Sequence, residues 1–93
     1  MQTSSDTAVE ATVALPANVD LHARPAADFV RTAMGFSSQL TVASGERAAD
    51  AKSLLAILAL GAKRGSTLRL TADGDDAVAA LDALTGCVAG FTE

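Results

Sequence analysis

Apolar and polar residues alternate in four short stretches of the chain. In the first stretch, Val9, Ala11 and Val13 alternate with polar or small residues. A period of two places every second side chain on the same face, which is typical of a half-buried strand. Residues 44–46, Ser-Gly-Glu, have the composition of a turn between two strands. We therefore predict four strands, at residues 9–15, 38–43, 47–50 and 67–72.

Three other stretches have the spacing of helices. From residue 23 to about residue 35, apolar side chains recur at intervals of three and four, which places them on one helix face. These side chains are Ala26, Phe29, Val30 and Ala33. Gly35 is expected to end this helix. A short apolar run, LLAILAL, follows Ser53 and ends at Gly61, and a last helix is expected at residues 77–89. Its predicted inward face consists of Ala77, Ala80, Leu81, Leu84, Cys87, Val88 and Phe91.

The order of these elements, βαββαβα, predicts the fold class. Every strand has one apolar face, so the helices should cover one side of an antiparallel sheet and leave the other side in water. The expected architecture is an α+β open-faced β-sandwich with four strands and three helices on one face. With 93 residues, the chain is long enough for one core. We expect a flexible N-terminal extension at residues 1–8 and a single domain at residues 9–93.

Composition and charge exclude several classes of function. The net charge is −4 and the seven basic residues are scattered along the sequence, which argues against a nucleic-acid partner. No apolar run approaches the roughly 20 residues that span a bilayer. The first residues lack the basic and apolar segments of a signal peptide. One cysteine cannot form an internal disulfide. We expect a cytoplasmic monomer that does not insert into membranes.

The only histidine of the chain lies in the stretch DLHARPA, at the expected start of the first helix. A helix N-terminus carries unpaired N–H groups and a partial positive charge, both of which favour anions. Pro25 fits the first helical turn, and Arg24 adds a permanent cation suited to oxyanions. A nucleophilic imidazole at His22 in this setting predicts a phosphorylated histidine.

Other interpretations of His22 do not involve a phosphoryl group. A histidine at a helix start is more often a solvated surface residue than a functional one. A zinc site would need further ligands, and only Cys87, on a predicted core face, is available. A Cys–His nucleophile pair lacks an orienting motif, and burial would make Cys87 unreactive.

The motif HARPA and the later stretch AKSLLAILALGAKRG resemble HPr, the histidine-containing phosphocarrier family of the bacterial phosphoenolpyruvate:sugar phosphotransferase system. The resemblance extends from Val9 to the C-terminus, and the order of elements agrees. It implies that His22 accepts phosphate from enzyme I and passes it to enzyme IIA. It also implies that Arg24 stabilises the phosphate, and that no metal or cofactor takes part.

The resemblance further implies a docking surface and a regulatory residue. The docking surface would hold enzyme I and enzyme IIA on an apolar patch beside the histidine. Its residues would be Ala23, Ala27, Leu54, Leu55 and Ala59. A run as continuous as LLAILAL cannot bury every side chain, so at least one or two of them should be exposed. Ser53 corresponds to a serine that a seryl kinase modifies in some bacteria, but an N-cap role for Ser53 is the simpler interpretation.

Two residues depart from the family pattern. The family usually has glycine where this chain has Asp20, and often a small polar residue where it has Val19. Asp20 tolerates the left-handed backbone that a turn can require. Its carboxylate, if it faces His22, would favour the protonated imidazolium and repel an incoming phosphoryl group. We therefore expect the transfer rate or partner choice to differ from the family pattern.

The sequence thus predicts a phosphocarrier rather than an enzyme with its own substrate. Two alternatives remain open at this point. The chain could be an HPr paralogue in a regulatory, nitrogen-related or dihydroxyacetone branch. It could also be a small α/β interaction domain in which His22 is never phosphorylated.

Overall fold

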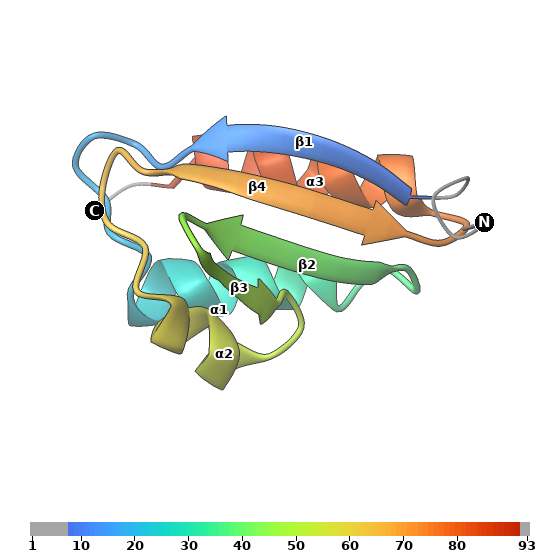
Figure 1. Ribbon diagram of the computed structural model, residues 1–93, viewed down its shortest axis with the longest axis horizontal. Helices are drawn as coiled ribbons and strands as arrows, with labels where there is room; N and C mark the ends of the chain where they lie inside the picture. The colour runs from blue at the N-terminus through green and yellow to red at the C-terminus, as the bar shows by residue number, and fades with distance from the viewer. Residues whose placement is uncertain (1–7, 92–93) are drawn as a thin grey trace.

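The computed structural model describes residues 8–91, and the predictions for residues 1–7 and 92–93 lie outside that part. The described residues form a four-stranded antiparallel sheet with the strand order β1-β4-β2-β3 (Figure 1). The strands are β1 (Ala8–Ala14), β2 (Gln39–Ser44), β3 (Arg47–Asp50) and β4 (Thr67–Asp73). Each predicted strand is confirmed, with limits that differ by at most one residue.

The two faces of the sheet differ as the alternation predicts. On the inner face, Val42 of β2 lies opposite Leu70 of β4 and Ala49 of β3, and all three side chains are buried. On the outer face, Thr41 and Arg69 are exposed. The sheet therefore has one dry and one wet face, which is the open-faced arrangement expected from the sequence.

All three helices lie on one side of the sheet (Figure 1). In Figure 1, α1 and α3 lie behind the strands and α2 lies beside β3. Helix α1 is capped by Met34 in a right-handed conformation, so it ends before Gly35, whose φ is not positive. Helix α2 ends at Gly61, whose φ of 65° is the left-handed cap expected there. The helices are α1 (Ala23–Ala33), α2 (Leu54–Leu60) and α3 (Ala77–Ala89).

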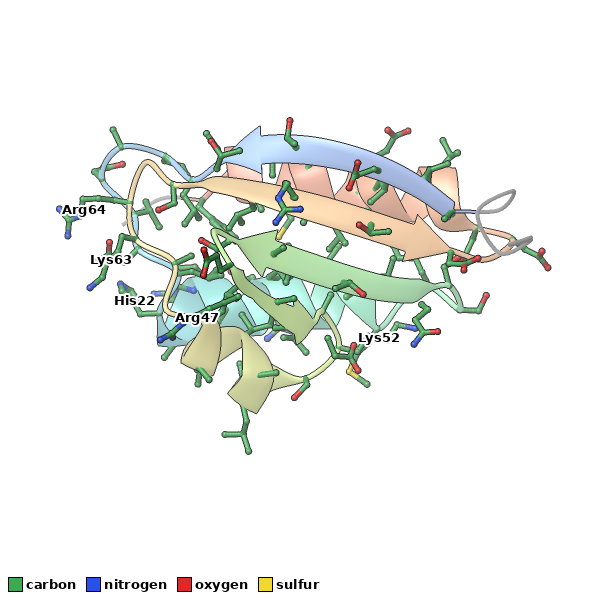
Figure 2. All side chains as sticks on the ribbon, in the orientation of Figure 1. His22, Arg47, Lys52, Lys63 and Arg64 are labelled. Carbon is green, nitrogen blue, oxygen red and sulfur yellow. The ribbon has the colours of Figure 1, made fainter. Side chains whose placement is uncertain are left out.

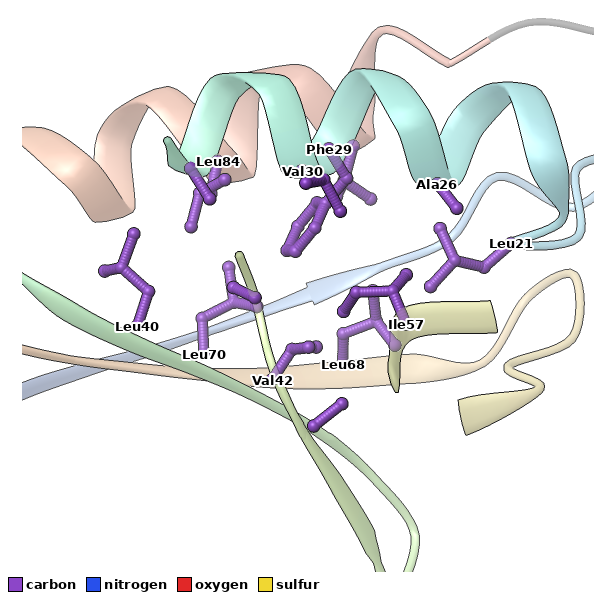
Figure 3. Packing of buried hydrophobic residues seen from close by; sticks show 14 of the residues in the cluster. Leu21, Ala26, Phe29, Val30, Leu40, Val42, Ile57, Leu68, Leu70 and Leu84 are labelled. Atoms are coloured by element: carbon purple, nitrogen blue, oxygen red, sulfur yellow. The ribbon is translucent and has the colours of Figure 1, made fainter. Parts of the chain in front are cut away.

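The core between sheet and helices consists mainly of aliphatic side chains. Figure 3 shows Phe29 of α1 pointing from the helix layer toward Leu70 and Val42 of the sheet. Phe29 is fully buried, and most of its neighbours in the core are Leu, Val or Ala. The predicted inward faces of α1 and α3 are confirmed, except that Cys87 is only half-buried. Such a core packs the helices close to the sheet and leaves their termini fixed.

One polar anchor joins the α1–β2 connection to the start of α3. The carboxylate of Asp76 accepts hydrogen bonds from the backbone N–H groups of Ser37 and Ser38, both at 2.9 Å, and from the Ser38 hydroxyl. Asp76 is also the N-cap residue of α3, but its side chain makes no cap hydrogen bond. Gly74 approaches this anchor so closely that a Cβ atom there would lie 2.5 Å from Ser38 Oγ.

Candidate functional site

His22 is the N-cap residue of α1, as the motif predicts. Its backbone is extended, its carbonyl accepts the first helical hydrogen bond from Ala26 at 2.8 Å, and its own N–H donates to Asp20 O at 2.9 Å. The imidazole is exposed and makes no capping hydrogen bond. Pro25 lies in the first turn, and the N–H groups of Ala23 and Arg24 have no intrahelical acceptor because they belong to that turn. The backbone thus uses His22 as a cap and leaves its ring available for chemistry.

The segment before His22 is tied to the connection between α2 and β4. The Asp20 carboxylate accepts hydrogen bonds from the backbone N–H of Arg64 at 2.7 Å and from the Arg64 guanidinium at 3.3 Å. The backbone N–H of Leu21 donates to Ala62 O at 3.0 Å. Val19 and Leu21 are buried, so apolar packing in the core also fixes this segment. Position and direction of the His22 backbone follow from these contacts.

The same contacts change the interpretation of Asp20. The side-chain and then the backbone hydrogen bonds from Arg64 lower the pKa of the Asp20 carboxyl, so it is ionised at neutral pH. Both carboxylate oxygens face Arg64, which offsets their charge. The contacts therefore favour Asp20 as an anchor of the histidine segment, rather than as a carboxylate that acts directly on the imidazole.

His22 and Arg24 line different hollows in the surface. Arg24 borders a hollow of about 390 Å³ between α1 and the end of α3, together with Asp28, Cys87 and Phe91. His22 borders a shallower one of about 240 Å³ on the α2 side. Its other lining residues are Asp20, Leu21, Leu58, Gly61, Ala62 and Lys63. Arg24 is exposed, so its long side chain is not confined to the α3 side.

Three leucines of α2 are exposed, and one of them borders the hollow of His22. Leu55 is 80% exposed, Leu54 40% and Leu58 37%, which confirms that the run LLAILAL cannot bury every leucine. Leu58 lines the same hollow as His22, although the sequence analysis did not single it out. Its spacing of three and four from Leu55 and Leu54 would have placed it on their face. We call Leu54, Leu55 and Leu58 the leucine patch.

The three alanines predicted to belong to the docking surface differ in exposure and location. Ala23 is exposed in the first turn of α1, and Ala27 is half-buried one turn later. Ala59 is exposed but lines a different hollow, between α2 and β3. Its carbonyl accepts a hydrogen bond from Arg47 at 3.2 Å. Ala59 therefore faces a different hollow from Leu58, which lines the histidine hollow.

Several basic residues that are far apart in the sequence lie at the same end of the molecule as the histidine (Figure 2). Figure 2 shows Lys63, Arg64 and Arg47 at the same end of the molecule as His22, whereas Lys52 lies apart. Lys63 and Arg64 belong to the α2–β4 connection, and Arg47 is the first residue of β3. Basic residues that are separated in the sequence are therefore brought to one end of the folded chain (Figure 2). The surface around His22 is basic although the chain has a net charge of −4.

The remaining candidates have structural roles. Ser53 is the N-cap of α2, and its hydroxyl accepts a hydrogen bond from the Ala56 N–H at 3.2 Å, which confirms the cap. Burial raises the pKa of the Cys87 thiol, which makes it a poor nucleophile. Within residues 8–91, no cluster of three His, Cys, Asp or Glu side chains could hold a metal ion. No helix in this range is long and apolar enough to span a membrane.

Comparisons with known proteins show the family of this chain. A family model described as the PTS HPr component phosphorylation site matches residues 9–89. The phosphocarrier protein HPr of Haemophilus influenzae is 42% identical over 82% of this chain and 89% of its own length. The chain belongs to the HPr family. Its fold also matches the crystal structure of HPr-C-His from Thermoanaerobacter tengcongensis, with a TM-score of 0.83 and 41% identity over 87% of this chain and 91% of that one.

HPr proteins are phosphocarriers of the phosphotransferase system, and the family therefore sets the class of function. A multiphosphoryl transfer protein of Xanthomonas campestris contains a similar segment, 43% identical over 89% of this chain. The present chain spans only 10% of the length of that protein. The HPr structure confirms the open-faced fold that the sequence predicted.

Proposed function

We propose that this HPr-family protein accepts a phosphoryl group on His22 from phosphoenolpyruvate-charged enzyme I and passes it to enzyme IIA of the sugar phosphotransferase system, in the cytoplasm. The observation that carries the proposal is the placement of His22, in a chain whose family is defined by a phosphorylation site. The ring is exposed at the N-terminus of α1, with no side-chain cap bond to occupy it.

Transfer needs a nucleophile that approaches phosphorus without obstruction. In the proposed step, the lone pair of one ring nitrogen of neutral His22 attacks phosphorus and a new N–P bond forms. The donor's bond to phosphorus breaks, and its electron pair stays with the donor. The reverse chemistry then moves the group to the next acceptor. An exposed ring suits both steps because two different partners must reach the same atom in turn.

The surroundings of His22 offset the charge that arrives with the phosphoryl group. The unpaired N–H groups of the first turn and the positive end of α1 lie beside the ring. Arg24 is exposed in that turn, and its guanidinium can donate several hydrogen bonds to phosphate oxygens. We assign Arg24 the role of stabilising the phosphoryl group. No metal or cofactor is required for this chemistry.

The leucine patch gives the partners a surface to bind. Apolar side chains exposed together are typical of a contact with another protein. The patch borders the hollow of His22 through Leu58, so a partner seated on it would bring its own reactive group to the imidazole. Enzyme I and enzyme IIA would share this surface, with Ala23 and Ala27 at its α1 edge. Phosphorylation of Ser53 by a seryl kinase stays a prediction from the family resemblance.

The carrier role is tested by loading and discharging the intact protein. Incubation with enzyme I, phosphoenolpyruvate and magnesium should add one phosphoryl group, seen as a mass increase of the intact chain. After removal of enzyme I, addition of enzyme IIA should return the chain to its original mass while enzyme IIA gains the group. A chain that is never loaded would be an interaction domain. A chain that loads but does not discharge to any enzyme IIA would belong to another phosphotransfer branch.

A further inference from the structure

Lys63 shares the hollow of about 240 Å³ with His22. Lys63 is exposed and lies beside His22 at one end of the molecule (Figure 2). Throughout residues 8–91, no carboxylate lies within ion-pair distance of its ammonium group. The hollow of His22 is therefore bordered, on the side of α2, by a lysine that forms no ion pair within the described residues.

The contacts of its neighbours hold Lys63 in this place. On one side, the carbonyl of Ala62 accepts a hydrogen bond from the Leu21 N–H at 3.0 Å. On the other side, the backbone and guanidinium of Arg64 donate to the Asp20 carboxylate. The residues before and after Lys63 are thus bonded to the two residues that precede His22. Lys63 can change rotamer, but its Cα cannot move away from the histidine while these bonds persist.

Arg64 and Lys63, the two basic residues near His22 on this side, interact differently with Asp20. The Asp20 carboxylate is bound by Arg64, whose hydrogen bonds lower the pKa of that carboxyl most. The charge of Lys63 also lowers this pKa, but it contributes least. Arg64 therefore compensates the only carboxylate that lines the hollow, and the charge of Lys63 remains available to an anion. Arg24 borders the other hollow, on the α3 side. A phosphoryl group on His22 would have one cation on each side.

We propose that Lys63 binds the phosphoryl group carried by His22, from the side opposite Arg24. The inference rests on the proposed phosphorylation of His22 and adds a residue to it. An ammonium within about 4 Å of a phosphoryl oxygen favours the doubly ionised form of the group over the singly ionised form. Lys63 therefore stabilises the loaded carrier itself, without any partner present.

The test measures the ionisation of the phosphoryl group in the isolated protein. The wild type and three variants, Lys63→Gln, Lys63→Arg and Arg69→Gln, are loaded with phosphate and separated from enzyme I. The ³¹P resonance of the phosphohistidine is then followed against pH. Arg69 lies on the outer face of β4, so Arg69→Gln is a matched control for the loss of one positive charge. Because no partner is present, an effect on docking does not enter the measurement.

We expect Lys63→Gln to raise the pKa of the phosphoryl group by about half a unit, because a screened contact between unit charges at about 4 Å is worth roughly that much. Lys63→Arg should restore the wild-type value, and Arg69→Gln should leave it nearly unchanged. A value in Lys63→Gln equal to that in Arg69→Gln would overturn the role of Lys63 while leaving the carrier function intact. If the wild type shows no phosphohistidine resonance, the proposed function fails, and the role of Lys63 fails with it.

Discussion

At the scale of single residues, the proposed site assigns the roles of cap, nucleophile and cation to different groups. The backbone of His22 caps α1 while its ring remains unbound, and Arg24 is exposed two residues further on, in the first turn of α1. Asp20, which stands in place of the family's glycine, anchors the histidine segment because its carboxylate forms an ion pair with Arg64. Each of these roles depends on a side chain's direction, which sequence spacing alone does not define.

Replacement of Arg24 by Ala should slow phosphate acceptance more than it weakens binding of enzyme I. A charge that acts mainly on the group in transfer contributes to the rate rather than to affinity. Loss of one preorganised donor typically costs on the order of a hundredfold in rate. The measurement is the single-turnover rate at saturating enzyme I, with Arg31→Ala, an exposed residue in the last turn of α1, as control. Equal rates for wild type and Arg24→Ala would contradict the role assigned to Arg24.

At the scale of elements, two long-range polar contacts hold the ends of the helices. Asp20 to Arg64 fixes the approach to α1, and Asp76 to Ser38 fixes the approach to α3. In both cases a loop carboxylate binds backbone N–H groups of another loop. These contacts place the helix termini relative to the sheet, and the N-terminus of α1 is the one that carries the site.

The anchor at Asp76 should make stability depend on pH in the acid range. The Ser38 hydroxyl first, and the Ser37 N–H next, lower the pKa of the Asp76 carboxyl from 3.8 to about 2. Because the folded value lies below the unfolded one, the anchor stabilises the fold above about pH 4, and this contribution is lost as the pH falls toward 2. Asp76→Asn should lower the Tm by several degrees at pH 7 and flatten its dependence on pH between 4 and 2.

Thermal unfolding followed by circular dichroism measures this effect. Asp75→Asn is the matched control, because Asp75 is the exposed neighbour of Asp76. Similar Tm curves for the two variants would show that the carboxylate of Asp76 is not an anchor.

The local elements could be predicted from the sequence, but the contacts between loops could not. The alternation of apolar residues predicted every strand, and their spacing predicted the helices. Both patterns depend only on which side of a short segment faces the core. The partners of Asp20 and Asp76 lie 44 and 38 residues away. Those pairs depend on the strand order β1-β4-β2-β3, which brings distant loops together. The same reason explains why the basic residues looked scattered, whereas Leu58 was missed only because its helical spacing was not used.

At the scale of the whole molecule, the charges are unequally distributed along β4. The basic α2–β4 connection precedes this strand at the end that carries His22. Asp73, the last residue of β4, and Asp75 of the β4–α3 connection lie at the other end (Figure 1). A chain with a net charge of −4 therefore has a basic surface around its only histidine. Together with the leucine patch, this surface marks the end of the molecule at which we propose that partners bind.

Removal of the most exposed leucine should weaken docking without affecting the fold. Leu55 is 80% exposed, so Leu55→Ser removes little buried area from the folded chain, and its Tm should stay close to the wild type. Loss of an apolar side chain that a partner buries typically weakens binding by about tenfold. The affinity for enzyme I is measured by calorimetry, with Val78→Ser on α3, another exposed apolar side chain, as control. Equal affinities of both variants would exclude Leu55 from the docking surface.

The central claim is that this chain carries phosphate on His22, and one measurement tests it most directly. Wild type and His22→Ala are incubated separately with enzyme I, phosphoenolpyruvate and magnesium, and the mass of each intact chain is recorded before and after mild acid and mild alkali. Because His22 is exposed, the substitution should leave unfolding cooperative. We expect the wild type to gain one phosphoryl group that acid removes and alkali does not, and His22→Ala to gain none. Uptake of an acid-labile phosphoryl group by His22→Ala would contradict the assignment.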